Sequence, residues 1–168
     1  MAMVTMDVKD LSVEIFKLID KKTPLLTAGS REKYNTMTVS WGSLGTLWSV
    51  PASTVYVRPQ RYTHEFMDSS DYYTLSFFSD EYRKAMEFCG SNSGRTVDKA
   101  EKCGLTVAYT EEGAPYFEEA ELVLVCKKMY HQDFDPKGFC YERLSGLYAN
   151  QDYHTMYVGE VVQALKKQ

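Results

Sequence analysis

The sequence lacks two features that would place the chain in or across a membrane. It contains no apolar run long enough to span a bilayer, and its first ten residues show no basic segment followed by a hydrophobic one. A membrane-spanning helix needs about 20 mostly apolar residues, and a secretory signal needs both of those parts. We therefore expect a cytoplasmic protein with no membrane partner.

The chain also lacks an overall excess of positive charge. Its formal net charge is −4 and its pI is about 5.4. Proteins that bind nucleic acid broadly usually carry a basic surface, so no nucleic-acid partner is expected. The basic residues are nevertheless grouped locally, as Arg58 with Arg61 and Arg95 with Lys99. Local basic groups on an acidic protein favour a small anion such as phosphate.

Cysteine and histidine are few, and neither is spaced for metal binding. No Cys-x-x-Cys pair occurs among the four cysteines, and the three histidines share no metal-ligand spacing, so no metal site is expected. Disulfides are rare in a reducing cytosol. Cys89 alone lies beside cationic residues, which can lower a thiol pKa, although an inert thiol is the favoured interpretation. The cysteines are Cys89, Cys103, Cys126 and Cys140.

The composition is that of one globular domain. The 168 residues are 44% hydrophobic and 25% charged, with no internal repeat, low-complexity tract or flexible linker. We expect a single domain over 1–168. Aromatic residues make up 14% of the chain, including 13 tyrosines. Tyrosine suits sheet edges, interfaces and ring-shaped ligands, so this enrichment does not decide among them.

Strand patterns dominate the chain. Runs rich in β-branched and aromatic residues alternate with Gly, Pro and polar turn residues, and the stretch Gly29–Asn35 is typical of a hairpin loop. Many strands separated by turns predict a mainly β fold, namely a β-barrel with helical insertions. The predicted strands are Pro24–Ala28, Thr36–Trp41, Thr54–Val57, Tyr72–Phe78, Leu122–Met129 and Tyr157–Ala164, the last interrupted at Gly159.

Helical patterns are shorter. Asp80–Phe88 has apolar positions on one face, and Asp80 is a candidate N-cap. Asp98–Cys103 predicts a short helix that ends at Gly104. One or two helical turns are expected over Thr63–Met67, and Ser12–Asp20 fits either a short helix or an irregular strand.

The first candidate binding segment is Val57–Thr63. Arg58 and Arg61 follow the end of a predicted strand, and the guanidinium group is a planar fork of donors that matches phosphate oxygens. Thr63 adds a hydroxyl where a helix is expected to begin, and helix N-termini attract anions. The alternative is that both arginines form ordinary ion pairs with Glu65 or Asp68.

The second candidate segment, Cys89–Lys99, is rich in Gly and Ser and also contains Arg95. Small residues let backbone N–H groups converge on an anion, and the basic side chains would supply charge. The segment is not a Walker loop, because GxxxxGK[ST] is absent. The alternative is a flexible loop between two helices.

Two further features concern a ring-shaped ligand. In a strand over 36–41, Thr36, Thr38 and Ser40 would share one face, which suits a polar heterocycle or, alternatively, a face in contact with water. His154 precedes the last predicted strand, where a lone histidine is more often structural than catalytic. No GxSxG elbow supports a nucleophile arrangement.

Taken together, these segments resemble the flavin reductase-like family with the FMN-binding split barrel. The resemblance covers about Thr23 to Val162, and the combination of NTMTVSWG with VYVRPQRYT is its most specific part. It implies an antiparallel split β-barrel of roughly six strands, in which two subunits of a homodimer hold FMN between them. The matching stretches are PLLTAG, NTMTVSWGSLG, TVYVRPQRYTHEF, YTLSFF, CGSNSGRTVDK and DYHTMYVGEV.

The resemblance also implies roles for individual residues. Three groups would contact FMN, His154 would face a nicotinamide donor, and Trp48 is a further candidate for contact with the ring. The ring would be lined by Thr38, Val39, Ser40 and Trp41, the ribityl-phosphate side by Arg58, Pro59, Gln60, Arg61 and Thr63, and the phosphate closed over by Ser91, Ser93, Gly94, Arg95 and Lys99.

The function implied is that of an FMN-dependent oxidoreductase. Hydride would pass from NADH or NADPH to the flavin, and electrons would then pass to a small-molecule acceptor or a redox protein. FMN rather than FAD is expected, since no GxGxxG fingerprint is present to hold an adenylate. Two alternatives remain open: a non-enzymatic electron carrier and a flavin-storage protein, because fold and cofactor do not determine the substrate.

Overall fold

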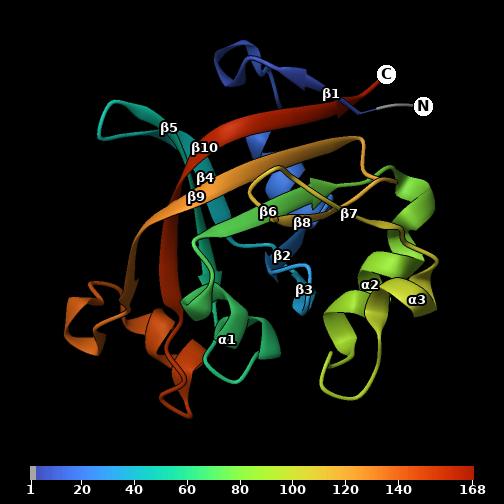
Figure 1. Cartoon of the computed structure of the whole chain (residues 1–168). Coiled ribbons are helices and arrows are strands. Elements are labelled where there is room, and N and C mark those ends of the chain that lie inside the picture. Colours follow the sequence, from blue (N-terminus) through green and yellow to red (C-terminus); the bar gives the residue numbers. More distant parts are fainter. Residues whose placement is uncertain (1–2) are drawn as a thin grey trace.

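The main feature of the computed structural model is a curved antiparallel sheet of eight strands (Figure 1). Residues 3–168 are described, while residues 1–2, at the start of the segment considered for a secretory signal, lie outside the described part. The strand order is β3-β2-β6-β9-β10-β5-β4, with β1 paired to β10 and a separate β7-β8 pair. The strands are β1 Met3–Met6, β2 Leu25–Gly29, β3 Tyr34–Thr38, β4 Gly42–Leu47, β5 Val50–Val57, β6 Tyr72–Phe77, β7 Val107–Tyr109, β8 Pro115–Phe117, β9 Leu122–Asp133 and β10 Thr155–Lys167.

Short helices connect the strands. In Figure 1, α2 and α3 lie together at one side of the sheet, and α1 lies at one end of it. Within residues 3–168, no helix is long and apolar enough to cross a membrane. The helices are α1 Tyr62–Ser69, α2 Arg83–Ser91 and α3 Lys99–Cys103, with single-turn helical segments η1 Val8–Asp10, η2 Lys17–Lys21, η3 Asp80–Tyr82 and η4 Pro136–Gly138 and the longer η5 Glu142–Tyr148.

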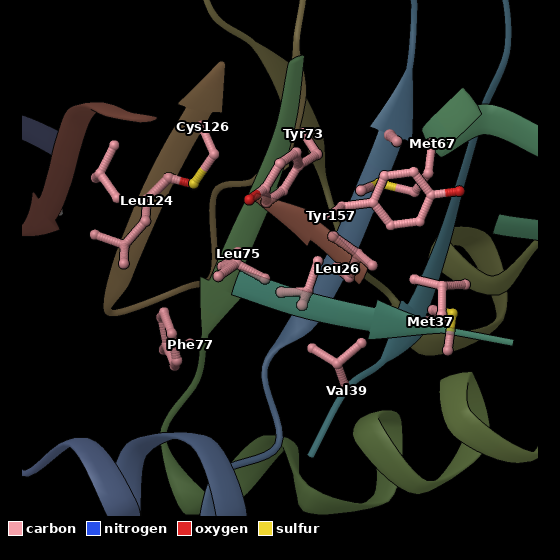
Figure 2. Close-up of a cluster of buried hydrophobic side chains, with 14 of the residues drawn as sticks. Leu26, Met37, Val39, Met67, Tyr73, Leu75, Phe77, Leu124, Cys126 and Tyr157 are labelled. Atoms are coloured by element: carbon pink, nitrogen blue, oxygen red, sulfur yellow. The ribbon is translucent and has the colours of Figure 1, made fainter. Parts of the chain in front are cut away.

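The core lies inside the curve of the sheet. Leu26 of β2 pairs in register with Met37 of β3 and with Leu75 of β6, and Leu75 pairs with Leu124 of β9. Because alternate residues of a strand face the same side, this ladder sets one buried row across four strands. Figure 2 shows these side chains directed toward one another, together with Tyr73. The curved sheet wraps around this shared core, with β3 and β4 at the two ends of the strand order.

The outer face of the sheet is also covered. Leu25, Val123 and Val125 alternate with the core residues and pack against Met86 and Cys89 of α2. A strand that is buried on both faces has apolar residues at every position, which explains the continuous apolar run at the start of β9. The predicted fold class, a mainly β antiparallel split barrel with short helices, is confirmed.

Gly159 does not interrupt β10, although it does change its register. The pairing of β10 with β9 shifts between Val158 and Gly159. A Cβ atom on Gly159 would lie 2.6 Å from the hydroxyl oxygen of Tyr73, which is hydrogen-bonded to Ser53 Oγ at 2.6 Å. The glycine therefore makes room for a large ring in the centre of the core.

Two helix predictions are confirmed in detail. Asp98 caps α3, since its carboxylate accepts from the backbone N–H of Glu101 at 3.0 Å, and Gly104 ends the helix with a φ of 63°. The helix expected over Thr63–Met67 is α1, which extends the prediction at both ends.

Two other helix predictions need correction or completion. The predicted helix over Asp80–Phe88 exists as η3 followed by α2, but Asp80 as its N-cap was wrong: the cap positions are Ser79 and Tyr82, and neither makes a side-chain cap hydrogen bond. The segment Ser12–Asp20 is helical from Ile15 onward, and its last part belongs to the π-helical turn η2, so the helix alternative fits better than the strand.

The predicted strands were found at the expected positions in the sequence, but their first and last residues differ. The strand expected over Thr36–Trp41 runs from Tyr34 to Thr38, which shortens the hairpin loop predicted over Gly29–Asn35. The chain then leaves the sheet, and Gly42–Leu47 forms β4, which the sequence did not predict. The short strands β1, β7 and β8 were also missed, and β5, β9 and β10 are longer than predicted. Strand ends depend on the partner strand, which local sequence does not contain.

Candidate functional site

The end of β3 marks the centre of the candidate site. Thr36 is buried and bonded to Thr27 Oγ1 at 2.9 Å, so it belongs to the packing of the sheet. Thr38 is half-buried, and after it Ser40 and Trp41 become exposed. The predicted shared polar face of Thr36, Thr38 and Ser40 is therefore divided, and only its last two residues are accessible.

A small cavity, here called the strand cavity, opens beside this segment. Its volume is about 190 Å³. Trp41 forms an open wall with 44% of its surface exposed, and its ring lies 4.9 Å from that of His154. The cavity is lined by Met37, Thr38, Val39, Ser40, Trp41, Tyr56, Arg58, Arg61 and His154.

A second cavity, here called the loop cavity, has a volume of about 300 Å³. It adjoins the strand cavity, with which it shares Met37, Arg58 and Arg61. Its lining comes from β3, the segment that leads into α1, and the loop between α2 and α3: Asn35, Met37, Arg58, Gln60, Arg61, Tyr62, Thr63, Ser91, Asn92, Ser93, Gly94 and Lys99. We call the two cavities together the groove: its aromatic end is the strand cavity with Trp41 and His154, its basic end is the loop cavity with Lys99, and both arginines lie in the shared wall.

Arg58 and Arg61 differ in their partners. Arg58 forms an ion pair with Asp152 and donates to the carbonyl of Leu147 at 3.0 Å. Arg61 donates to the carbonyl of Gly90 at 3.2 Å, and no carboxylate within residues 3–168 forms an ion pair with it. Arg61 is therefore the guanidinium group of the groove whose charge is not neutralised by a neighbour.

Three predicted residues lie outside the groove lining. Arg95 forms an ion pair with Glu65, and its guanidinium lies 4.5 Å from the ring centre of Tyr62. Pro59 lines neither cavity. Trp48 is at the turn between β4 and β5, 60% exposed, where it contacts Tyr130 rather than the groove. The alternative raised for Arg58 and Arg61, ion pairs with Glu65 or Asp68, does not hold in that form: Arg58 pairs with Asp152, and Glu65 pairs with Arg95.

Lys99 lies in the wall of the loop cavity and is almost fully buried. Its ammonium group donates to the carbonyls of Thr36 at 2.7 Å and of Cys89 at 2.8 Å, which joins β3 to α2. Burial lowers its pKa. Three donors are available on an ammonium group, so one remains beyond these two bonds.

The basic end of the groove also contains the start of α1. Arg61 is the cap residue of this helix, and its side chain makes no cap hydrogen bond to the first turn. Uncapped N–H groups at a helix N-terminus favour anions. Asn35 donates to the Thr63 hydroxyl at 2.8 Å, and a Cβ atom on Gly94 would lie 1.8 Å from Asn35 Oδ1. Only glycine allows the loop to approach β3 this closely.

His154 is buried at the aromatic end of the groove. Its Nδ1 atom is 2.8 Å from the hydroxyl oxygen of Tyr148. Burial, with a smaller contribution from the Arg58 charge, lowers its pKa to about 4. The imidazole is therefore neutral at pH 7.

This shift predicts a specific loss of stability in acid. Between pH 6.5 and about 4 the unfolded chain takes up a proton on His154 and the folded protein does not, so the free energy of unfolding falls as the pH falls. The contribution is at most about 3 kcal/mol. Urea unfolding at pH 7 and pH 4.5 should show a smaller loss in His154→Phe than in the wild type. An equal loss in both proteins would contradict the prediction, and His131→Gln, at an exposed position, is the control.

Cationic residues lie near Cys89 in the sequence and can lower the pKa of a thiol, but the structure shows the opposite environment. Cys89 is fully buried, and its sulfur lies 3.8 Å from that of Cys103. Burial raises the pKa of the Cys89 thiol to about 12, and the nearby Lys99 charge opposes this only in part. The inert-thiol interpretation agrees with this environment.

The sequence did not identify several residues of the groove. Asn35, Tyr56 and Tyr62 line it, Asp152 holds Arg58, and Tyr148 contacts His154. Asp152 lies two positions before His154 in the DYH segment and could have been considered as a partner. No sequence pattern around Tyr148 indicates that it contacts the site.

Comparison with known proteins agrees with the fold. The family model of the Flavin reductase like domain matches residues 17–167. A search of curated protein sequences gives no significant match. Among solved structures, flavoredoxin from Methanosarcina acetivorans superposes with a TM-score of 0.70 at 26% identity, over 86% of this chain and 68% of that one.

Two more distant structures share the fold. An FMN-binding protein from Thermus thermophilus, crystallised with p-hydroxybenzaldehyde, has a TM-score of 0.69 at 21% identity and covers 86% of this chain and 71% of its own. An NADH:FAD oxidoreductase from Streptomyces globisporus has a TM-score of 0.65 at 21% identity, over 86% and 73% of the two chains.

Proposed function

Because the chain belongs to the flavin reductase-like domain family, a family of flavin-linked oxidoreductases, we propose that it binds FMN in the groove and oxidises NADH or NADPH there. The observation that carries this proposal is the polarity of the groove. Its aromatic end offers Trp41 and His154, the start of α1 lies at its basic end, and Arg61 lies in the wall that the two ends share. FMN has the same polarity, with a flat ring at one end and a phosphate at the other.

The residues of the groove fit such a ligand. Thr38, Val39, Ser40 and Trp41 would hold the ring, because the chain leaves the sheet there and its backbone groups become available. The phosphate would lie near Arg61 and the first turn of α1, where positive charge and uncapped N–H groups meet. Pro59 and Arg95 lie outside the lining, so the remaining contacts of this end would come from around the start of α1 and from the α2–α3 connection: Arg58, Gln60, Thr63, Ser91, Ser93, Gly94 and Lys99.

A bound flavin supplies the electron-transfer chemistry, and the protein supplies orientation and electrostatics. In this role His154 would orient the nicotinamide donor or stabilise charge on it. Its low pKa argues against a proton-carrying role at neutral pH. Acceptors in this proposal are a free flavin, a metal complex or a redox protein.

The test is an absorbance spectrum of the purified protein, followed by anaerobic addition of NADH and then of NADPH. We expect a yellow protein that bleaches with one or both donors. His154→Ala should retain FMN but bleach more slowly. A yellow protein that neither donor reduces would instead favour an electron carrier or a flavin-storage protein. A colourless protein that takes up no added FMN would contradict the proposal.

We further propose that the protein is a homodimer, as expected for a flavin held between two subunits. Leu47 and Trp48 at the β4–β5 turn and Tyr130 of β9 are 39%, 60% and 41% exposed, respectively. Large apolar side chains that gather at a surface mark interaction sites. Light scattering should give twice the 19.3 kDa chain mass, and Trp48→Glu should reduce that mass toward the monomer. A monomeric wild type at micromolar concentration would contradict this.

A further inference from the structure

The segment between β9 and β10, residues 134–153, is here called the strap. Figure 1 shows it at the end of the sheet where α1 also lies. It contains an aromatic cluster: the rings of Phe139 and Tyr148 are 5.5 Å apart and nearly parallel, and the ring of Tyr153 lies 5.0 Å from that of Tyr148. The cluster places Tyr148 against His154.

Tyr148 is held on several sides. Its ring is 6% exposed, and the Arg58 guanidinium lies 5.2 Å from the ring centre. Arg58 also bonds the carbonyl of Leu147, the residue just before it, and pairs with Asp152 just after the strap's last helical turn. Arg58 therefore anchors the strap to the end of β5, and the phenol has little freedom to leave its position.

The hydrogen bond from this phenol determines which nitrogen of His154 carries the proton. Tyr148 Oη and His154 Nδ1 are 2.8 Å apart. A neutral imidazole has one N–H, and the unprotonated nitrogen is a better acceptor than a phenol oxygen, whereas a phenol O–H is a good donor. The favoured arrangement is donation from Tyr148 into Nδ1, which leaves the hydrogen on Nε2.

We propose that Tyr148 is a positioning residue that holds His154 in the Nε2–H tautomer, so that the strand cavity is presented with an N–H donor. The ligand group that this donor would take is a neutral acceptor oxygen, such as a carbonyl or carboxamide. The assignment of the tautomer stands on the contact itself, and the use of the donor by a nicotinamide rests on the function proposed above.

The tautomer can be measured directly from the imidazole ¹⁵N chemical shifts of uniformly labelled protein at pH 7. The His154 resonances are identified by their absence in His154→Gln. We expect a predominantly Nε2–H imidazole in the wild type and a several-fold larger Nδ1–H population in Tyr148→Phe. The matched control is Tyr153→Phe, which removes a hydroxyl from the same cluster that makes no hydrogen bond within residues 3–168; it should leave the tautomer unchanged.

An Nδ1–H imidazole in the wild type, or an unchanged tautomer in Tyr148→Phe, would overturn the proposal. A change of equal size in Tyr153→Phe would do so too, because it would reflect packing alone. These measurements need no electron donor, so their outcome is independent of whether a nicotinamide reduces the protein.

A kinetic measurement then tests the use of the donor group. With FMN bound, Tyr148→Phe should lower kcat/KM for NADH or NADPH about fivefold to tenfold, which corresponds to one hydrogen bond, and should change FMN affinity less than twofold. Tyr153→Phe should remain near the wild type. Loss of FMN affinity in Tyr148→Phe would show that the residue shapes the groove rather than orienting His154.

Discussion

Replacing Arg61 with alanine is expected to lower the affinity for FMN at least tenfold and to leave riboflavin binding nearly unchanged. Arg61 borders both cavities, and no carboxylate within the described residues pairs with it. A hydrogen bond to a charged group contributes about 1.5–3 kcal/mol, which corresponds to roughly a tenfold to a hundredfold change in the dissociation constant. Riboflavin has the same ring but no phosphate, so its affinity should not depend on a contact between Arg61 and the phosphate.

Two further variants make this measurement specific. Arg61→Gln retains an N–H donor for the Gly90 carbonyl without the charge, and it should discriminate between FMN and riboflavin in the same way. Arg83→Ala removes an exposed arginine of α2 that pairs with Asp80, and it should change neither affinity. Fluorescence titration of the apoprotein with both ligands gives the dissociation constants. Equal losses for FMN and riboflavin would mean that Arg61 does not contact phosphate.

Replacing Lys99 with methionine is expected to destabilise the folded protein by about 2–4 kcal/mol. Methionine keeps the apolar stem, but the carbonyls of Thr36 and Cys89 lose a buried donor. An unsatisfied buried polar group costs about 1–3 kcal/mol, and here β3 also loses its link to α2. Urea unfolding without flavin, followed by circular dichroism, measures the difference, and Lys102→Met, at an exposed position of the same helix, is the control.

The same variant separates two roles for Lys99. If the lysine acts mainly by joining β3 to α2, FMN and riboflavin should weaken together, because the wall of the loop cavity moves. A loss confined to FMN, with stability unchanged, would instead assign Lys99 to the phosphate, as the family resemblance implies. A stability equal to that of the wild type would contradict the destabilisation argued here.

The two arginines of the VRPQR segment show how far sequence reasoning reaches. Their spacing predicted a basic group at a strand end, and both do border the groove. The sequence could not separate their roles, since the competing acids considered were near in sequence, whereas the true partner of Arg58 is Asp152, 94 positions away. We expect Arg58→Ala to affect both ligands, because Arg58 supports the strap as well as the groove.

The sequence by itself determined the class of fold and the segments that meet at the groove. Alternating apolar residues, turn residues between them and the Asp98 and Gly104 helix ends are local patterns, and each is readable within a few neighbours. Only the tertiary structure decided which polar side chains of the groove are held by partners within the protein and which remain available to a ligand. Arg61 has no acidic partner among the described residues, Lys99 donates to two carbonyls, and Tyr148 contacts His154. All three arrangements depend on the register of strands and on the connecting strap, so only the folded chain produces them.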